Sequence, residues 1–300
     1  MARHGANAAV SAIVAQLGAR FQLFEQIGEG GFGRVYRCFD RVRRCELAVK
    51  VLGRAGDAEQ CAFRLEYETL CALHSEHIVR AFDYLESDGV CAFSMEYLRG
   101  TTFVRWVREG GRCQEPRLRQ GLRQVARALV TLHAQNIVHR DVKPQNLFVC
   151  EDGRVVLLDF GLATRTDLAN AHVDWRSEGT VAYMAPEQLA SLPLTCAADL
   201  YGLGVVCYES LTGLRPFQGD ARAQLLAKFG QTPHPPSVWT RGVAPDLEAL
   251  VLALLSADVE LRPTAQELLD HYDVSNCGDP RRSSTQVHAE PGPSSSCARK

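Results

Sequence analysis

The most informative run of the sequence is His139-Arg-Asp-Val-Lys-Pro-Gln-Asn146, and Asp159-Phe-Gly161 follows it along the chain. Between them, two β-like runs flank the pair Asp152-Gly153, a combination that predicts a β-hairpin. The hairpin would bring Asn146 and Asp159, which lie at its two ends, close together. Because Mg²⁺ is a hard cation that prefers oxygen ligands, these two side chains suit a magnesium site.

Asp141 and Lys143, inside the first stretch, suit the transfer of a phosphoryl group. A carboxylate such as that of Asp141 can accept a proton from a hydroxyl nucleophile. The ammonium group of Lys143 can neutralise charge on the phosphoryl group during its transfer. Each short piece could occur by chance, but the order and spacing of all of them together favour phosphoryl-transfer chemistry.

The run Gly28-Glu-Gly30-Gly-Phe-Gly33 is a second candidate for contact with phosphates. A dinucleotide-binding glycine motif should open a helix, with the pyrophosphate at the helix N-terminus. Here the glycines lead instead into Phe32–Cys38, whose alternating pattern predicts a strand. A glycine loop between two strands can fold over phosphates and donate backbone N–H groups to them.

Lys50 lies in an apolar strand and needs a counter-charge, which the following helix supplies. In the helix expected over residues 58–74, Glu66 shares the apolar face with Phe63, whereas Glu68 points nearly the opposite way. We therefore predict an ion pair between Lys50 and Glu66. Lys50 is expected to be accessible from a cleft, so that its replacement would leave the fold intact.

The chain divides into four parts by composition and periodicity. They are an N-terminal extension (1–20), a β-rich part with one main helix (about 21–95), a helical part (about 99–273) and a tail expected to be disordered (274–300). The helical part holds an apolar stripe at helical spacing: Leu118, Leu122, Val125, Leu129 and Leu132. These patterns predict an α+β chain of two lobes, with a cleft between them.

The composition is that of an ordinary globular protein, with 46% hydrophobic and 23% charged residues among 300. A net charge of −2 argues against a general nucleic-acid binder. No run approaches the roughly 18 apolar residues of a membrane span, and no leader peptide is recognised, so a cytoplasmic location is expected. The 11 cysteines form no CxxC pair, which favours reduced thiols over zinc ligands or disulfides.

Together these motifs resemble the eukaryotic-type (Hanks-type) serine/threonine protein kinases, over about residues 21–273. The resemblance implies a bilobal kinase fold with the active site in the cleft. It also implies transfer of the γ-phosphoryl group of ATP to serine and threonine hydroxyls of protein substrates, with Mg²⁺ or alternatively Mn²⁺, and autophosphorylation. Lys143 and Gly179-Thr180 indicate the serine/threonine class, and Gly179–Gln188 has a bacterial character.

The resemblance assigns roles to individual residues. Asp141 is the implied catalytic base, with Lys143 and Thr180 beside it, and Asn146 and Asp159 are the implied metal ligands. Met95 is the implied gatekeeper, before a hinge whose backbone at Glu96 and Leu98 would bind adenine. The implied ATP site comprises Ile27, Gly28, Glu29, Gly30, Gly31, Phe32, Gly33, Arg34, Val35, Ala48, Lys50, Glu66, Met95, Glu96, Leu98 and Phe148.

The resemblance also implies structural and regulatory residues. Glu187, in Ala185-Pro-Glu187, would pair with Arg262, and Asp199 would brace the catalytic loop. His139 would pack under the Asp159-Phe-Gly161 turn. Arg140 precedes the catalytic aspartate, as in kinases that phosphorylation of the activation segment switches on. The candidate phosphate acceptors are Ser177, which we favour, and Thr166.

Two other classes of function are possible for a chain of this kind. A pseudokinase would act as a binding scaffold, but such proteins often lack the lysine, the aspartate or a metal ligand, and none is missing here. A small-molecule phosphotransferase generally lacks the segment that shapes the peptide groove, whereas Ala185-Pro-Glu187 is present. The sequence therefore favours an active protein kinase with protein substrates.

Overall fold

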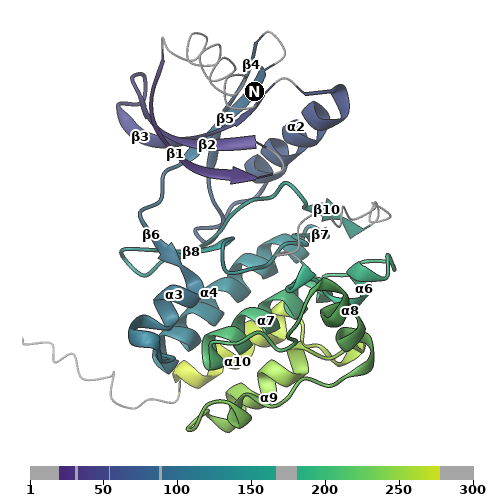
Figure 1. Cartoon of the computed structure of the whole chain (residues 1–300). Helices are drawn as coiled ribbons and strands as arrows, with labels where there is room; N and C mark the ends of the chain where they lie inside the picture. Colours follow the sequence, from purple (N-terminus) through teal and green to yellow (C-terminus); the bar gives the residue numbers. More distant parts are fainter. Residues whose placement is uncertain (1–19, 31–32, 54, 88–89, 167–180, 278–300) are drawn as a thin grey trace, which may run out of the picture.

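The computed structural model describes residues 20–30, 33–53, 55–87, 90–166 and 181–277. Within these ranges the chain forms an upper lobe made mainly of strands and a lower lobe made mainly of helices (Figure 1). The predicted α+β, bilobal fold is therefore confirmed. The extension before residue 20 and the tail from residue 278 lie outside the described ranges.

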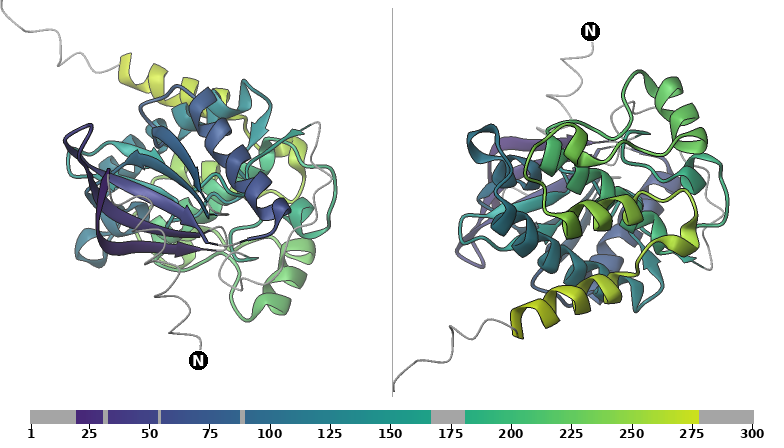
Figure 2. Two further views of the ribbon diagram at one scale, coloured as in Figure 1. Left: turned by 90° about the horizontal axis from the view of Figure 1, so that it is seen from above. Right: turned by 90° about the horizontal axis from the view of Figure 1, so that it is seen from below.

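The upper lobe is one five-stranded antiparallel sheet with a helix packed beside it (Figure 2). The strand order is β1-β2-β3-β5-β4. The strands predicted over Phe32–Cys38 and around Lys50 are present as β2 and β3, whereas the sequence analysis did not identify β1 and β4. The elements are β1 (Phe21–Gly30), β2 (Gly33–Asp40), β3 (Cys45–Leu52), α2 (Asp57–Ala72), β4 (Ala81–Ser87) and β5 (Val90–Glu96).

The lower lobe is built around α4 and α7. The apolar stripe predicted at helical spacing is fully buried in α4, and nearly every side chain of α7 is buried. The first elements are β6 (Gly100–Thr102), α3 (Phe103–Val107), the 3₁₀ turn η1 (Glu109–Gly111), α4 (Glu115–His133), β7 (Ile137–Val138), β8 (Leu147–Cys150), β9 (Val155–Leu157) and β10 (Thr164–Arg165).

The remaining elements surround α7 and complete the lobe. They are α6 (Pro186–Leu189), α7 (Ala197–Thr212), α8 (Ala221–Gly230), η3 (Pro236–Val238), α9 (Pro245–Leu254), η4 (Val259–Leu261) and α10 (Ala265–Cys277). Helix α10, yellow in Figure 2, lies at the periphery of the lobe and packs against α4. It ends at Cys277, so the expectation of a disordered tail from residue 274 is wrong for its first four residues, which continue the helical backbone.

A substitution at Gly121, in the middle of α4, would test how closely α3 packs against α4. A methyl group at this position would lie 2.3 Å from Cε2 of Phe103, which is fully buried. Alanine favours a helix by about 1 kcal/mol over glycine, but overpacking a core costs about 1–3 kcal/mol. We therefore expect Gly121→Ala to lower the midpoint of thermal unfolding, measured by calorimetry, by several degrees.

Gly230, the last residue of α8, is the matched control for this substitution. A methyl group there would meet no atom within 4 Å. Gly230→Ala is expected to leave the melting temperature unchanged or raise it slightly. A Gly121→Ala variant as stable as the Gly230→Ala variant would contradict the close packing of Phe103 on α4.

Nine cysteines, from Cys38 to Cys207, are free thiols. Within the described ranges, no cluster of three or more His, Cys, Asp or Glu side chains could hold a metal ion. In the same ranges, every helix is too short or too polar to cross a lipid bilayer.

Candidate active site

Lys50 of β3, Glu66 of α2 and Asp159 meet between the two lobes. The Nζ of Lys50 lies 2.6 Å from Oε1 of Glu66 and 3.0 Å from Oδ1 of Asp159. The predicted pairing of Lys50 with Glu66 is therefore confirmed. The ion pair forms because Glu66 lies on the same buried face of α2 as Phe63, as the helical spacing predicted. Glu68 lies on the exposed face.

The expectation that Lys50 is accessible from the cleft is wrong. Its side chain is only 8% exposed, and that of Glu66 only 2%. β3 is an inner strand, hydrogen-bonded to β2 on one side and β5 on the other. The amino group can be buried there because two carboxylates neutralise it.

The three groups shift each other's protonation. Burial alone would lower the pKa of Lys50, but Asp159 and Glu66 outweigh it, and the net pKa is raised. Burial raises the pKa of Glu66 despite the nearby ammonium group. Burial also acts to raise the pKa of Asp159, but Lys50 outweighs it and holds that pKa below its usual value. The side chain of Asp159, 44% exposed, thus presents an ionised carboxylate to solvent.

Asp141, Lys143 and Asn146 form a compact polar group in the loop after β7. Oδ2 of Asp141 accepts a hydrogen bond from Nδ2 of Asn146 at 2.8 Å, and Nζ of Lys143 lies 2.7 Å from it. Oδ1 of Asp141 is buried, and no hydrogen-bond partner for it is found among the described residues. A buried carboxylate oxygen in this state is suited to accept a proton from an incoming hydroxyl.

The predicted hairpin is present as β8 and β9, and it brings Asn146 and Asp159 together. Leu147 lies opposite Leu157, and the N–H of Leu158 donates to the carbonyl of Asn146 at 2.8 Å. Asp159 follows directly, with a left-handed backbone (φ 58°). Such a conformation is strained for a residue with a side chain, by about 1–3 kcal/mol, and strain of this kind clusters at functional sites.

Asp199, near the start of α7, holds the backbone of the catalytic loop. Its carboxylate accepts hydrogen bonds from the amides of His139 at 2.9 Å and Arg140 at 2.8 Å. Nε2 of His133 lies 3.0 Å from the same carboxylate. Burial acts to raise the pKa of Asp199, but the hydrogen bond with His133 and the other contacts outweigh it, so the net pKa is lowered. The contact predicted for Asp199 is confirmed. His133 was not predicted, because nothing marks it in α4 except its place in the last turn.

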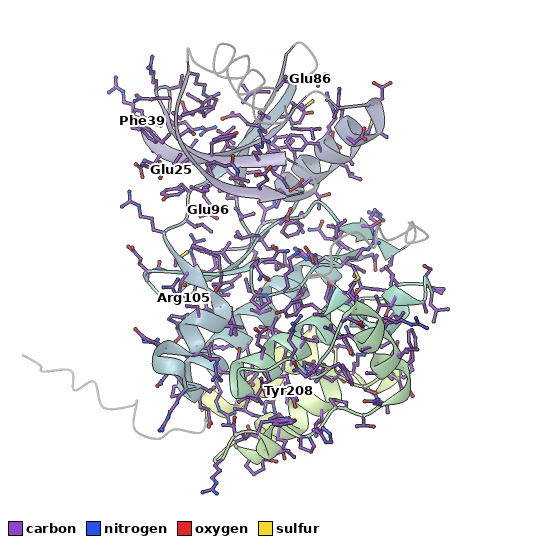
Figure 3. All side chains as sticks on the ribbon, viewed as in Figure 1. Glu25, Phe39, Glu86, Glu96, Arg105 and Tyr208 are labelled. Atoms are coloured by element: carbon purple, nitrogen blue, oxygen red, sulfur yellow. The ribbon has the colours of Figure 1, made fainter. Side chains whose placement is uncertain are left out.

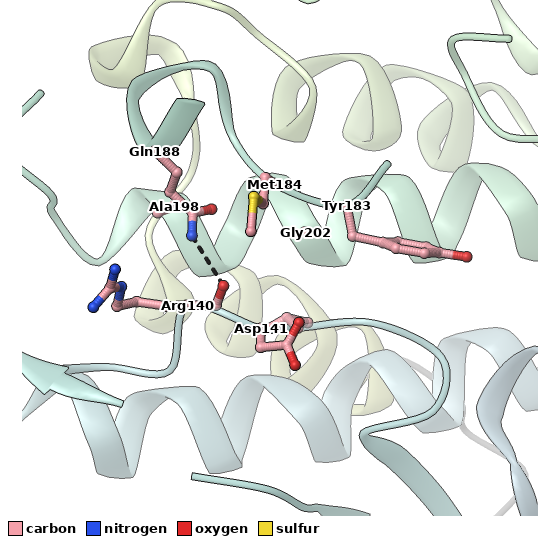
Figure 4. A pocket seen from close by; sticks show the side chains of 8 residues that line it. Arg140, Asp141, Tyr183, Met184, Gln188, Ala198 and Gly202 are labelled. Atoms are coloured by element: carbon pink, nitrogen blue, oxygen red, sulfur yellow. Dashed lines mark hydrogen bonds between the residues drawn. The ribbon is translucent and has the colours of Figure 1, made fainter. Parts of the chain in front are cut away.

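Arg140 has a left-handed backbone (φ 70°) and is fixed from both sides. Asp199 binds its N–H, while Nε2 of Gln188 donates to its carbonyl at 2.9 Å (Figure 4). The side chains of Arg140 and Asp141 point in opposite directions (Figure 4). This role of Gln188 was not predicted from the sequence. Its position directly after Glu187 is the one sequence signal that could have identified it.

Figure 4 shows a pocket behind the catalytic loop, in which Gln188 lies. Its walls come from the loop itself, from the segment before α6, from α6 and from α7. The lining residues are Arg140, Asp141, Val142, Tyr183, Met184, Gln188, Ala198 and Gly202. Any movement of the segment that carries Tyr183 and Met184 would therefore change the surroundings of Asp141.

Two further predicted contacts are confirmed. The guanidinium group of Arg262 forms a bidentate pair with Glu187, at 2.6 and 2.9 Å, and both side chains are buried. The ring of His139 packs edge-on against Phe160, with centroids 4.9 Å apart. Nε2 of His139 lies 2.9 Å from the carbonyl of Leu158, so it is the nitrogen that donates.

The glycine-rich run forms the ends of β1 and β2. Gly28 lies opposite Val35, and Gly30 opposite Gly33, so the run connects two paired strands, as predicted. A side chain at Gly33 (φ 124°) would lie 2.4 Å from the carbonyl of Val51. Ile27 is exposed, and Glu29 and Arg34 form an ion pair near the turn. Gly31 and Phe32 lie outside the described residues.

The predicted hinge lies where the two lobes join. Met95 of β5 is paired with Ala48 of β3. Glu96, at the end of β5, lies between the lobes (Figure 3), and its carboxylate pairs with Arg154 at 2.8 Å. Leu98 follows in the connection to β6, and Phe148 lies in β8, the strand next to β6.

The predicted regulatory residues are only partly described. Thr166 follows β10, and its N–H donates to the carbonyl of Asn136 at 2.9 Å. Arg140 is buried at 8% exposure, and burial lowers the pKa of its guanidinium group. Ser177 and Thr180 lie outside the described residues.

Comparisons with known proteins agree with this geometry. A family model described as "Protein kinase domain" matches residues 21–272. The chain is 32% identical to the serine/threonine-protein kinase PknA of Corynebacterium glutamicum, over 94% of the chain and 63% of that protein. It is 32% identical to PknE of Mycobacterium tuberculosis, over 81% of the chain and 43% of that protein. It is 30% identical to the serine/threonine-protein kinase PrkC of Bacillus subtilis, over 81% of the chain and 38% of that protein. The chain thus spans between about two fifths and two thirds of the length of these relatives.

Proposed function

The chain belongs to the protein kinase family, and from this premise we propose that it transfers the γ-phosphoryl group of ATP to serine and threonine hydroxyls of proteins. Members of the family use ATP with a divalent metal ion. We assign the activity to a catalytic domain over residues 21–273. The observation that carries the proposal is that Lys50 pairs with Asp159, while Asp141 pairs with Lys143 and Asn146 at the other end of the β8–β9 hairpin.

The side chains present fit this chemistry. Oδ1 of Asp141, buried and without a partner among the described residues, would accept the proton of the substrate hydroxyl. Lys143, 2.7 Å from the other oxygen of that carboxylate, would hold positive charge beside the transferred group. Lys50, kept ionised by Glu66 and Asp159, would orient the remaining phosphates.

We propose Mg²⁺ as the metal, held by the oxygens of Asn146 and Asp159. Nδ2 of Asn146 donates to Asp141, which leaves the amide oxygen of Asn146 for another partner. Mg²⁺ is commonly bound by one or two carboxylates together with substrate phosphates, and two protein side chains therefore suffice. When bound, the ion supplies neutralisation of phosphate charge.

We also propose the substrate class and the cellular location of the protein. Protein substrates would lie against the segment that ends at Ala185-Pro-Glu187, and a net charge of −2 does not favour nucleic acid. The free thiols among the described cysteines suit a reducing compartment, which supports a cytoplasmic location. The pseudokinase alternative has no observation in its favour, since every polar group that the chemistry requires is present.

The test is a phosphotransfer assay with the purified chain, γ-labelled ATP, Mg²⁺ and casein as a generic acceptor. We expect labelled casein, with the label on serine and threonine after acid hydrolysis. A binding scaffold would bind ATP or a partner without labelling protein. Label on tyrosine alone, or on small molecules alone, would contradict the proposed acceptor class.

We propose further that Ser177 is autophosphorylated and that Ser177→Ala lowers activity several-fold. A phosphate on the activation segment could be bound by Arg140 in bidentate fashion and so order the segment. Thr166 is the second candidate, and Thr166→Ala serves as the comparison. Mass spectrometry of the active enzyme should find phosphate on Ser177, and a segment free of phosphate between Asp159 and Glu187 would refute the proposal.

A further inference from the structure

Lys228 of α8 is a buried lysine with an unusual set of partners. Its residue exposure is 2%, and its Nζ donates to the carbonyls of Val181 at 2.8 Å, Ala182 at 3.0 Å and Met184 at 2.5 Å. The three N–H groups of one ammonium therefore bind three carbonyls within four consecutive residues. Among the described residues, no carboxylate lies within ion-pairing distance of this nitrogen.

The segment that Lys228 binds runs directly into the Ala185-Pro-Glu187 motif. Val181 and Met184 also pack with Leu189 and against Leu225 of α8, so the same helix supports the segment through apolar contacts. Tyr183 and Met184 line the pocket that contains Asp141 (Figure 4). The segment thus connects α8 to the surroundings of the proposed catalytic base.

Burying a cation without a carboxylate is costly unless hydrogen bonds replace its water. Here the three carbonyls do so, and the Nζ also lies 5.2 Å from the centroid of the Tyr201 ring. A backbone segment with three carbonyls fixed to one point has little freedom to move. A solvent-exposed lysine would make none of these contacts. The burial of Lys228 therefore serves to hold this backbone segment in place.

We propose that Lys228 is a positioning residue for the protein substrate: its ammonium group fixes the backbone of Val181–Met184 as the floor of the peptide groove. This inference rests on the proposed function and deepens it, because the acceptor protein would lie on this segment. Lys228 touches neither the nucleotide site nor Asp141. It should therefore affect the use of protein substrate and leave the use of ATP nearly unchanged.

The charged and titratable neighbours make this role dependent on pH. Glu187 of α6, already paired with Arg262, favours the charged lysine, whereas Arg215 after α7 disfavours it; Tyr201 of α7 contributes its ring. Burial, the largest effect, lowers the pKa of Lys228 to about 7. A neutral amine has only two N–H groups for three carbonyls, so the segment should loosen as pH rises above 7.

The test compares Lys228→Met with Arg222→Met, which removes an exposed cation from the same helix. For Lys228→Met we expect the KM for casein to rise at least tenfold, with the KM for ATP within twofold of wild type. Arg222→Met should match wild type in both. In wild type the KM for casein should rise between pH 6.5 and 8.5, and in Lys228→Met this dependence should disappear. A merely structural role would lower kcat and stability together and would leave the pH profile unchanged.

Hydrogen exchange separates this inference from the proposed function. Without any substrate, amides in the peptide covering 181–189 should exchange at least tenfold faster in Lys228→Met than in wild type, while α4 and α7 keep their protection. Unchanged exchange would overturn the inference, and so would faster exchange with an unchanged KM for casein. A wild-type chain that labels no protein at all would contradict the proposed function and the substrate role, whereas the exchange data would still decide whether Lys228 fixes the segment.

Discussion

Replacing Asp141 with asparagine is expected to lower kcat for protein phosphorylation by about 10²- to 10⁴-fold. Asparagine keeps the shape of the side chain, and its one oxygen can still accept from Asn146 and Lys143, as Oδ2 of Asp141 does now. The amide nitrogen would then replace Oδ1, the buried oxygen to which the proton would go. A donor in that place cannot accept a proton, so transfer fails while the nucleotide site remains.

Initial rates at saturating Mg-ATP and a calorimetric titration with ATP measure the two properties separately. We expect the Kd for ATP to change by less than threefold. Asp152→Asn makes the same chemical change at an exposed carboxylate in the turn between β8 and β9, and it should leave both quantities unchanged. An Asp141→Asn enzyme within tenfold of the wild-type kcat would mean that another group takes the proton.

Replacing Lys50 with methionine is expected to have two effects. Phosphotransfer should fall by at least about a hundredfold, because the cation that would orient the phosphates is lost. The free energy of unfolding should also fall, by about 3 kcal/mol, because the Glu66 carboxylate is left buried without its partner. The second effect is contrary to what an accessible lysine would produce.

The loss of stability should depend on pH in a direction fixed by Glu66. Its pKa is already raised by burial, and removal of the ammonium would raise it further. A carboxyl with a raised pKa in the folded state stabilises the fold below its unfolded pKa, near 4.5, and this stabilisation is lost as pH rises through the folded value. Lys50→Met should therefore differ least from wild type at acid pH and increasingly as pH rises.

Urea unfolding of matched variants tests this explanation. The double variant Lys50→Met, Glu66→Gln carries no buried charge at this pair and should regain much of the lost stability, but none of the activity. Glu68→Gln, at an exposed position on the same helix, should resemble wild type. Wild-type turnover in Lys50→Met would refute the assignment of the ATP site, and an unchanged unfolding free energy would show that the buried pair does not hold α2 to the sheet.

The parts of the site that the sequence predicted are those fixed by local rules. The pair Asp152-Gly153 between two β-like runs gives the hairpin that joins Asn146 to Asp159. Helical periodicity selects Glu66 over Glu68 as the partner of Lys50. In both cases the geometry follows from residues close together in the sequence, so the pattern alone is sufficient.

The parts that the sequence did not predict depend on contacts between distant elements. The burial of Lys50 arises only when β2 and β5 flank β3. From the sequence alone, Lys228 would be expected at the surface of α8, because its three carbonyl partners lie more than 40 residues earlier in the chain. β1 is mostly exposed and lacks an alternating apolar pattern, so only its pairing with β2 makes it a strand.

The bracing of the catalytic loop also has a consequence for biosynthesis. The amides of His139 and Arg140 depend on Asp199, about 60 residues downstream, and Glu187 depends on Arg262, 75 residues further along. The ribosome synthesises the chain from its N-terminus. The glycine-rich run and the catalytic loop therefore emerge from the ribosome well before these downstream partners. The left-handed backbone of Arg140 has nothing to hold it at that stage. The chain must therefore be synthesised past Arg262 before the catalytic loop and the Ala185-Pro-Glu187 motif have all these partners, so shorter nascent chains should lack the proposed kinase activity.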